Sequence, residues 1–207
     1  MSESKTTNIQ KVLTGANRDR PDAVIRPFSG AYLLPAGNEV MTLTQWKTLY
    51  LLIDGARDEI LKDVYHGIKL SDINIMHLSN KGALDFLQKM RGIALVHVDD
   101  TDDKYKIDTI FSGPFEVDRD PIKDQIDGTG YFRYQFSETF KALYALDEGA
   151  WAALSMPTIM RCNSKYTFKL YQVASNYYQL DNQFAKQREF TLEAFRKTME
   201  IPQGTYP

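Results

Sequence analysis

Few side chains of this sequence have the types and spacing that chemistry at a catalytic site requires. The single cysteine, Cys162, could act as a nucleophile only beside an activating histidine, and no feature of the sequence places one there. The three histidines, His66, His77 and His97, are too scattered along the chain to predict a metal site. We therefore expect no catalytic residue, no metal and no cofactor, and we interpret the chain as a binding protein and not as an enzyme.

Two other patterns resemble ligand-binding loops but lack essential residues. The acidic turn at Asp99–Asp103 could bind a cation, but residues 99–110 contain neither the glycine at the bend nor the closing glutamate of a calcium loop. A solvent-exposed hairpin tip is the favoured interpretation of this turn. Gly128, Thr129 and Gly130 precede a predicted strand instead of a helix, so they do not predict a nucleotide-binding loop.

The polar side chains that could contact nucleic acid fall into two groups. Lysine and arginine contact phosphates, and glutamine can bind the edge of adenine. The first group lies on a predicted helix and comprises Lys81, Gln88, Lys89 and Arg91. The second lies in the last quarter of the chain, near a predicted helix start, and comprises Arg161, Lys165, Lys169 and Arg188. The alternative for both groups is a solvated surface without a partner.

Aromatic side chains alternate along residues 131–136. Tyr131, Phe132 and Tyr134 belong to this run, which is interleaved with Arg133 and Gln135. The run could be a platform on which bases stack. The favoured interpretation is that one face packs in the core while the other packs against a second copy of the chain, so these three residues are candidates for a dimer interface.

Composition limits the class of protein. The chain has 207 residues and a formal net charge of −2, with a pI of about 5.9, which counts against a strongly basic nucleic-acid binder but not against a local patch. Residues 99–127 are rich in aspartate, whereas residues 161–197 are mildly basic. A polar N-terminus, the lack of a long apolar stretch and a lone cysteine predict a cytoplasmic protein with no membrane partner.

These side chains must be positioned by helices and by a β-hairpin. Apolar residues recur at helical spacing from Leu43 to Ala56, and Ser71 is typical of the cap of a short helix that reaches Leu78. Asn80–Arg91 is predicted as a third helix, with Leu84, Leu87 and Met90 facing inward. Further elements are predicted at residues 24–34 (a strand or an extended arm), 64–70 (a short strand or turn), 93–98, 105–111 and 131–136 (strands), and at residues 137–146, 164–178 and 191–201 (helices).

The order of the predicted elements indicates an α+β fold. Three helices followed by a hairpin is the order of a winged helix, a helix-turn-helix with a β-hairpin wing. Asn80–Met90 is then the third helix, and the strands at residues 93–98 and 105–111 form the wing. The acidic tip of this hairpin would be repelled by phosphate, so we expect that it does not lie along DNA.

The C-terminal third resembles the initiator replication protein family of plasmids, whose members have two winged-helix domains. The run Ser164-Lys165-Tyr166-Thr167-Phe168-Lys169-Leu170-Tyr171 is similar to the start of the second domain of that family. Phe136-Ser137-Glu138, Thr191–Ile201 and Leu43-Thr44-Gln45 resemble further parts, in the same order, so that the resemblance covers about residues 40–206. In the family the second domain continues into a recognition helix and a wing, whereas this chain ends at Pro207.

The resemblance implies a domain organisation and a function. It implies a flexible N-terminal arm and extended segment at residues 1–38, a first winged-helix domain that dimerises at residues 39–148, and a linker with the truncated start of a second winged helix at residues 149–207. It implies an initiator of plasmid replication that binds double-stranded DNA at origin repeats and acts as a dimeric autorepressor, with host initiator, helicase and chaperones as partners. A winged-helix transcriptional regulator, or a protein-interaction module that does not bind DNA, remains an alternative.

Overall fold

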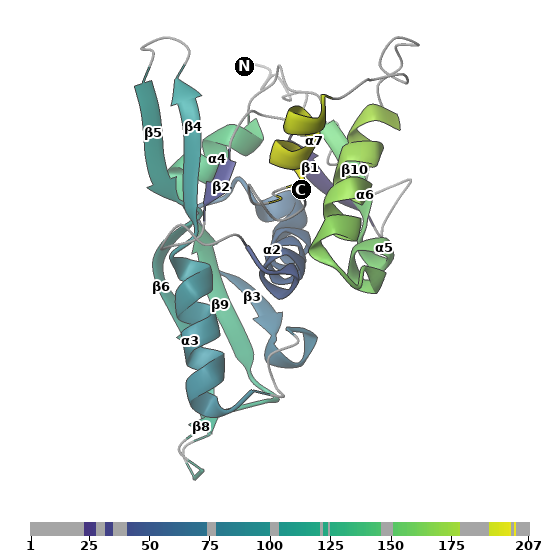
Figure 1. The fold of residues 1–207 in the computed structure, drawn as a ribbon. Coiled ribbons are helices and arrows are strands. Elements are labelled where there is room, and N and C mark those ends of the chain that lie inside the picture. Colours follow the sequence, from purple (N-terminus) through teal and green to yellow (C-terminus); the bar gives the residue numbers. More distant parts are fainter. Residues whose placement is uncertain are drawn as a thin grey trace, which may run out of the picture.

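The computed structural model describes residues 23–27, 32–34, 41–73, 78–99, 104–120, 122–123, 125–145, 151–178, 191–199 and 201. These residues form a mixed α+β structure of helices and small antiparallel sheets (Figure 1). None of the helices within these ranges is long and apolar enough to cross a membrane. The α+β class predicted from the sequence is confirmed.

Helix α2, Leu43–Ala56, lies at the centre of the molecule (Figure 1). It begins with a capping box, in which the Thr42 side chain accepts a hydrogen bond from Gln45 N at 3.2 Å, and Thr42 N donates to the Gln45 side chain at 2.8 Å. The helix ends at Arg57, which adopts a positive φ of 32° and forms a salt bridge with Asp54 at 2.8 Å. These boundaries confirm the helix that hydrophobic periodicity predicts.

A three-stranded antiparallel sheet packs beside α2 and α3. Its strands are β3 (His66–Lys69), β6 (Phe111–Val117) and β9 (Tyr131–Phe136), and β9 is the central strand. A register shift in β6 between Ser112 and Glu116 accompanies Gly113, whose φ of 65° is readily adopted by glycine alone. Beyond β6, the short strands β7 (Arg119–Asp120) and β8 (Gln125–Ile126) pair with one another.

The hairpin predicted at residues 93–111 is confirmed, and it also pairs with a strand from the N-terminal part of the chain. Strands β4 (Ala94–Asp99) and β5 (Lys104–Thr109) pair with one another, and β4 also pairs with β2 (Tyr32–Leu34). Strand β3 pairs with β9. The hairpin that closes over the helices is therefore β6–β9, because the aromatic residues of these two strands fill the core beneath them, whereas β4–β5 projects away (Figure 1).

The prediction of a short helix that begins at Ser71 is wrong at its start. A 3₁₀ turn, Leu70–Asp72, occupies this position, and Ile73 is extended with ψ of 114°. The Ser71 hydroxyl contacts the Asp72 carboxylate at 3.3 Å. Residues 74–77 lie outside the described residues. Helix α3, Asn80–Arg91, follows as predicted, with Ser79 as its N-cap and Gly92 as its C-cap.

The C-terminal part of the chain packs on the other side of α2. It comprises β10 (Trp151–Ser155), α5 (Met156–Arg161), α6 (Lys165–Tyr178) and α7 (Leu192–Thr198). Helix α4 (Glu138–Ala145) lies instead beside the β4–β5 hairpin (Figure 1), and its Phe140 ring stacks on the Phe136 ring of β9 at 4.6 Å between centroids. Pro157 lies in the first turn of α5, where a missing N–H costs nothing. Strand β10 pairs with β1, Ala23–Pro27, so the segment predicted as a strand or an extended arm is partly a strand.

One continuous hydrophobic core connects both sides of α2. On one side, Phe111, Phe132, Tyr134 and Phe136 of the sheet are buried. On the other side, the Phe168 ring of α6 lies 5.7 Å from the Trp46 ring and 5.5 Å from the Tyr50 ring, centroid to centroid. Because Trp46 and Tyr50 belong to α2, this helix joins the sheet to the C-terminal helices.

Candidate nucleic-acid interface

Helix α3 places the first predicted group of polar residues on its outer face. Ala83, Leu87 and Met90 are buried against the sheet, whereas Lys81, Gln88, Lys89 and Arg91 are exposed. The helix begins where the Ser79 hydroxyl accepts a hydrogen bond from Gly82 N at 3.2 Å. Lys89 and Arg91 lie in the last turn, where positive charge interacts favourably with the helix dipole.

The inward face of α3 differs from the prediction at one position. Leu84 is 49% exposed, and Ala83 is buried in its place. The helical period alone permits either phase, because residues 83 and 84 are 100° apart on the helix. The small Ala83 packs against the sheet, and Leu84 therefore lies on the outer face together with Lys81, Asp85 and Gln88. Lys89 forms a salt bridge with Asp85 at 3.2 Å across this face.

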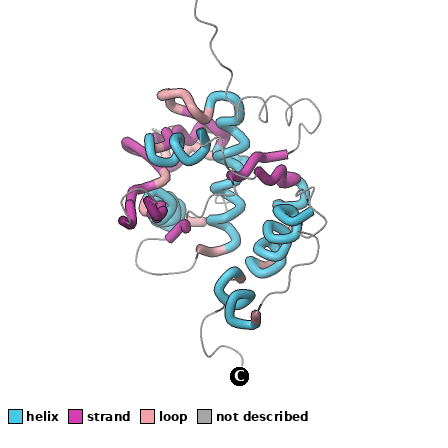
Figure 2. Tube along the Cα trace, turned by 90° about the horizontal axis from the view of Figure 1, so that it is seen from above, coloured by secondary structure: helices cyan, strands magenta, loops and turns pink. Residues whose placement is uncertain are grey.

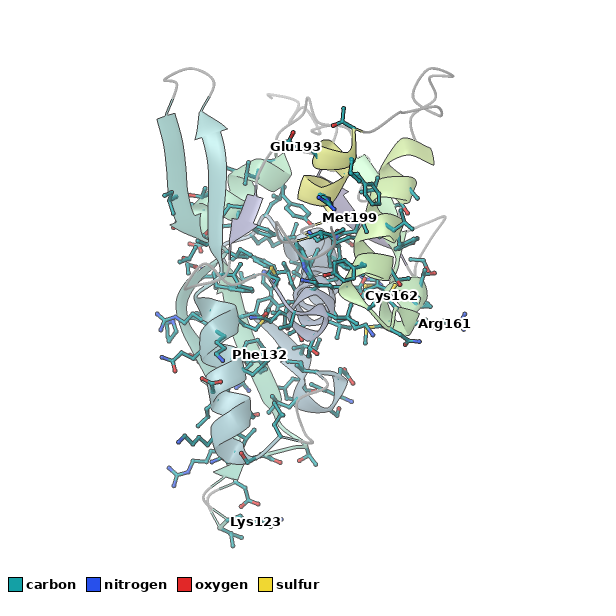
Figure 3. All side chains as sticks on the ribbon, in the orientation of Figure 1. Lys123, Phe132, Arg161, Cys162, Glu193 and Met199 are labelled. Carbon is teal, nitrogen blue, oxygen red and sulfur yellow. The ribbon has the colours of Figure 1, made fainter. Side chains whose placement is uncertain are left out.

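The turn between β7 and β8 lies at the N-terminal end of α3 (Figure 1). The Asn80 side-chain oxygen accepts a hydrogen bond from Ile126 N at 3.1 Å, which ties the two elements together. The Asp120 carboxylate accepts from Ile122 N at 2.9 Å and from Lys123 N at 3.2 Å, and these bonds fix the turn. Lys123 projects from its far end (Figure 3). Helix α3 and this turn therefore form one surface, which we call the α3–turn surface.

Asp118 anchors the base of this turn. Its carboxylate accepts hydrogen bonds from Arg133 Nη1 at 2.7 Å and from Tyr131 N at 2.9 Å. The Arg133 guanidinium and the Tyr131 N–H together lower the pKa of Asp118. Gly130 faces Asp118 so closely that an added Cβ would lie 2.5 Å from the Asp118 Cβ. A residue larger than glycine at position 130 would displace the turn.

The second predicted group of cations does not form one patch. Lys169 is only 8% exposed, and its Nζ lies 4.1 Å from the centre of the Trp46 ring. The prediction that Lys169 contacts phosphate is therefore wrong, because the α2–α6 packing buries its ammonium group over an aromatic face. Arg188 lies outside the described residues. The other two residues of this group are Arg161, at the end of α5, and Lys165, at the start of α6. Lys165 Nζ lies 5.1 Å from the centre of the Tyr166 ring.

The two groups of cations lie on different sides of the molecule. Helix α3 lies on one side of α2, and α5 and α6 lie on the other (Figure 1); the turned view shows the same separation (Figure 2). Arg161 extends from the outer edge of α5, away from the sheet that contains Phe132 (Figure 3). One straight segment of duplex that contacts α3 would therefore not reach Arg161 and Lys165.

The predicted dimer interface is corrected at two of its three residues. Phe132 and Tyr134 are 0% exposed, whereas Tyr131 is 43% exposed. Strand β9 is the central strand of its sheet, so both of its edges are already paired and its alternate side chains fill the core. The Tyr134 hydroxyl donates to the Leu52 carbonyl oxygen in that core. Phe132 and Tyr134 therefore cannot contact a second chain in this fold.

Sequence reasoning missed several residues of the α3–turn surface. The sequence predicts Asn80 only as the start of a helix and Leu84 as a residue of its inward face. Arg119 and Lys123 lie in a segment for which no strand was predicted. The run Asp118–Lys123 contains a turn signal, since Asp120 followed by Pro121 is typical of a turn. The pairing of this turn with the N-terminus of α3 had no sequence signal.

Burial shifts the pKa of the Cys162 and His66 side chains. The Cys162 thiol donates to the Thr158 carbonyl oxygen at 3.4 Å, and burial raises its pKa, which disfavours the nucleophilic thiolate. Burial lowers the pKa of His66, which packs against the Tyr134 and Phe136 rings. Within the described residues, no group of three or more His, Cys, Asp or Glu side chains lies close enough together to hold a metal ion.

The α3–turn surface exposes polar and cationic side chains together with Leu84. Comparison with known proteins adds no assignment to it. No protein-family model matches the chain, and a search of curated proteins returns no match.

Proposed function

We propose that the chain is a DNA-binding protein that acts by binding and not by catalysis, and that residues 41–136 form a winged helix. The strand order β3-β9-β6 supports this proposal, because the first strand of a winged helix pairs with the returning strand of its hairpin. In this assignment α3 is the recognition helix and the β7–β8 turn is the tip of the wing. The β4–β5 hairpin is then an insertion between α3 and β6.

The α3–turn surface is the observation that carries the proposal. An α-helix fits the major groove of B-form DNA, and lysine and arginine at its edges neutralise phosphates. Lys81 and Arg91 flank the outer face of α3, and Gln88 lies between them. The hydrogen bond between Asn80 and Ile126 N holds the wing tip beside this helix.

We further propose that the DNA-binding function is the initiation of plasmid replication in the cytoplasm. The support is the resemblance of the run Ser164–Tyr171, and of the motifs around it, to plasmid initiators. Origin repeats, a second copy of the chain, host initiator, helicase and chaperones are the partners in this proposal. A transcriptional regulator would have the same DNA-binding surface, and it is distinguished by the absence of repeated binding sites at a replication origin.

Fluorescence anisotropy with a labelled duplex, measured across a range of salt concentrations, tests DNA binding. The wild-type affinity is expected to fall steeply with salt, because each phosphate contact releases counterions. Replacing Lys81, Lys89 and Arg91 with glutamine is expected to weaken binding and to reduce the salt slope by up to about 3, roughly one for each lost contact.

A matched variant separates a local effect from a change in net charge. Replacing Lys62, Arg161 and Lys165 with glutamine removes the same charge from other parts of the surface and is expected to leave the slope nearly unchanged. Circular dichroism checks that both variants fold. Absence of wild-type binding at low salt, or an equal loss in both variants, contradicts the proposal for α3.

Self-association is the second candidate function, and the edge strand β5 favours it. Ile107 is 71% exposed on β5, which has a partner strand on one side alone within the part of the chain that the structure describes. An exposed edge strand can pair with a second chain. Sedimentation velocity at high micromolar concentration tests this: we expect a dimer for the wild type and a monomer for Ile107→Asp. A wild-type monomer contradicts the candidate function.

A further inference from the structure

The outer face of α3 presents one large apolar side chain among polar ones. Leu84 is 49% exposed there. Lys81 lies one turn before it and Gln88 one turn after it, and both are exposed. The inward positions are already filled by Ala83 and Leu87, so the fold provides no core position for Leu84. A partner that offers an apolar group beside a polar edge would complement this face.

The major groove of duplex DNA offers such a combination. The thymine C5 methyl is its apolar group, and adenine presents an N6 donor beside an N7 acceptor, which match the amide of glutamine. We propose that α3 distinguishes DNA sequences by placing Leu84 against a thymine methyl and Gln88 against an adenine edge. This inference rests on the proposed DNA-binding function and specifies which bases the surface selects.

The helix geometry limits where these bases lie. Leu84 and Gln88 are four residues apart, which corresponds to about 6 Å along the helix axis. Base pairs are stacked about 3.4 Å apart. The thymine and the adenine are therefore expected within about two base-pair steps of one another. The Ser79 cap and the hydrogen bond from Ile126 N to Asn80 hold the N-terminal end of α3 in place.

The charges around Leu84 favour DNA over an apolar protein surface as its partner. Lys81 and Arg91 are exposed on either side of it. Asp85 is the acidic residue on this face, and its carboxylate lies 3.2 Å from Lys89 Nζ. This salt bridge reduces the repulsion between Asp85 and phosphate, and the face as a whole carries an excess of positive charge.

Modified bases test each contact separately. A preferred sequence is first selected from a pool of random duplexes with the whole chain. The selected duplex is then prepared with deoxyuridine in place of thymidine, which removes the methyl group alone, or with 7-deazaadenine, which removes the N7 acceptor. Wild-type affinity is expected to fall about fourfold for each contacted methyl that is lost. We expect Leu84→Ala to bind the thymidine and deoxyuridine duplexes equally.

The other variants separate the two contacts. Gln88→Ala is expected to lose its sensitivity to 7-deazaadenine while it keeps its sensitivity to deoxyuridine. Leu170→Ala removes a leucine that is 51% exposed on α6, and it is expected to behave as the wild type. Leu84→Ala should retain the wild-type salt slope, because it removes no charge.

The failures of the two proposals are distinguishable. Three results overturn the base contacts and leave phosphate binding intact, provided that binding remains salt-dependent. They are the lack of a preferred sequence, the lack of sensitivity to deoxyuridine, and unchanged discrimination in Leu84→Ala. Absence of salt-dependent binding to any duplex overturns both proposals. A change in the sedimentation of Leu84→Ala, together with unchanged DNA discrimination, assigns Leu84 to a protein interface instead.

Discussion

At the scale of single residues, burial decides which of the predicted functional side chains can reach a partner. Lys169 carries a charge and Tyr134 a hydroxyl, yet each lies in the interior, over Trp46 and against the Leu52 carbonyl respectively. Both are satisfied there by contacts with the chain itself. A polar residue type is thus compatible with a surface role or a core role, and the packing of its neighbours distinguishes them.

Phe132 and Tyr131 give a direct test of this distinction. Phe132→Ala is expected to lower the free energy of unfolding by about 3–5 kcal/mol, because it leaves a cavity in the core. Tyr131→Ala removes a side chain that is 43% exposed and should cost much less. Urea denaturation measures both. Similar small losses for the two variants would mean that Phe132 is not in the core.

His66 makes stability depend on pH. Its imidazole is buried, its Nε2 has no hydrogen-bond partner among the described residues, and burial lowers its pKa. Glu59 acts in the opposite direction and Lys141 in the same direction. Below about pH 6.5 the unfolded chain therefore binds a proton that the folded chain does not, so stability falls as pH decreases through this range.

The variant His66→Gln isolates this effect. Its free energy of unfolding is expected to change less between pH 7 and pH 5 than that of the wild type. The slopes of the unfolding free energy against pH are expected to differ by an amount that corresponds to at most one bound proton. The comparison uses slopes, so a constant loss of stability in the variant does not affect it. Equal slopes for the two proteins contradict a lowered pKa of His66.

At the scale of elements, caps and tight contacts determine where the helices and turns begin. Ser71 and Ser79 both precede apolar segments, and the sequence predicts an N-cap at Ser71 and a helix that begins at Asn80. In the structure, the Ser79 hydroxyl caps α3 by accepting a hydrogen bond from Gly82 N. Within the described residues, the Ser71 hydroxyl forms a hydrogen bond with the Asp72 side chain alone. The predicted cap at Ser71 is therefore wrong, and the cap that the fold uses is Ser79.

Alanine at each serine separates the two. Ser79→Ala is expected to cost about 1 kcal/mol, because it leaves a helix N–H without its acceptor. Ser71→Ala should cost a few tenths of that value or less, as expected for a surface residue. Thermal denaturation of the two variants measures the difference. Ser79→Asp is expected to restore stability, since aspartate is also a good cap.

At the scale of the whole molecule, α2 joins two sides that the sequence analysis assigned to separate domains. Phe168 of α6 is fully buried against Trp46 and Tyr50 of α2, and Gln172 Nε2 donates to the Tyr50 hydroxyl at 2.7 Å. Strand β10 also pairs with β1. The contacts between the two sides are therefore apolar and hydrogen-bonded, as in the interior of a single folding unit.

This shared core predicts cooperative unfolding. We expect one transition in urea, with the same midpoint by circular dichroism and by tryptophan fluorescence. Phe168→Ala should shift both midpoints together, by an amount that corresponds to about 3–5 kcal/mol. Leu170→Ala, in the exposed position two residues later, should leave them nearly unchanged. Separate transitions for the two probes would instead indicate two independent units.

The sequence by itself determined the local elements of this protein. The boundaries of α2, α3, α6 and β9 follow from short-range causes: hydrophobic periodicity, caps and glycine. The α+β class and the exposed polar residues of α3 follow from the same patterns. These features depend on interactions within a few residues, so a single sequence contains the information that predicts them.

Tertiary structure decided the pairings and the final phase of each face. Strand β3 pairs with β9 and β1 pairs with β10, because long-range packing selects among strands of similar composition. The same packing placed Ala83 inward and Leu84 outward, and buried Lys169. Neighbouring positions on a helix differ by 100°, so either phase satisfied the local pattern, and only the shape of the opposing sheet could choose between them.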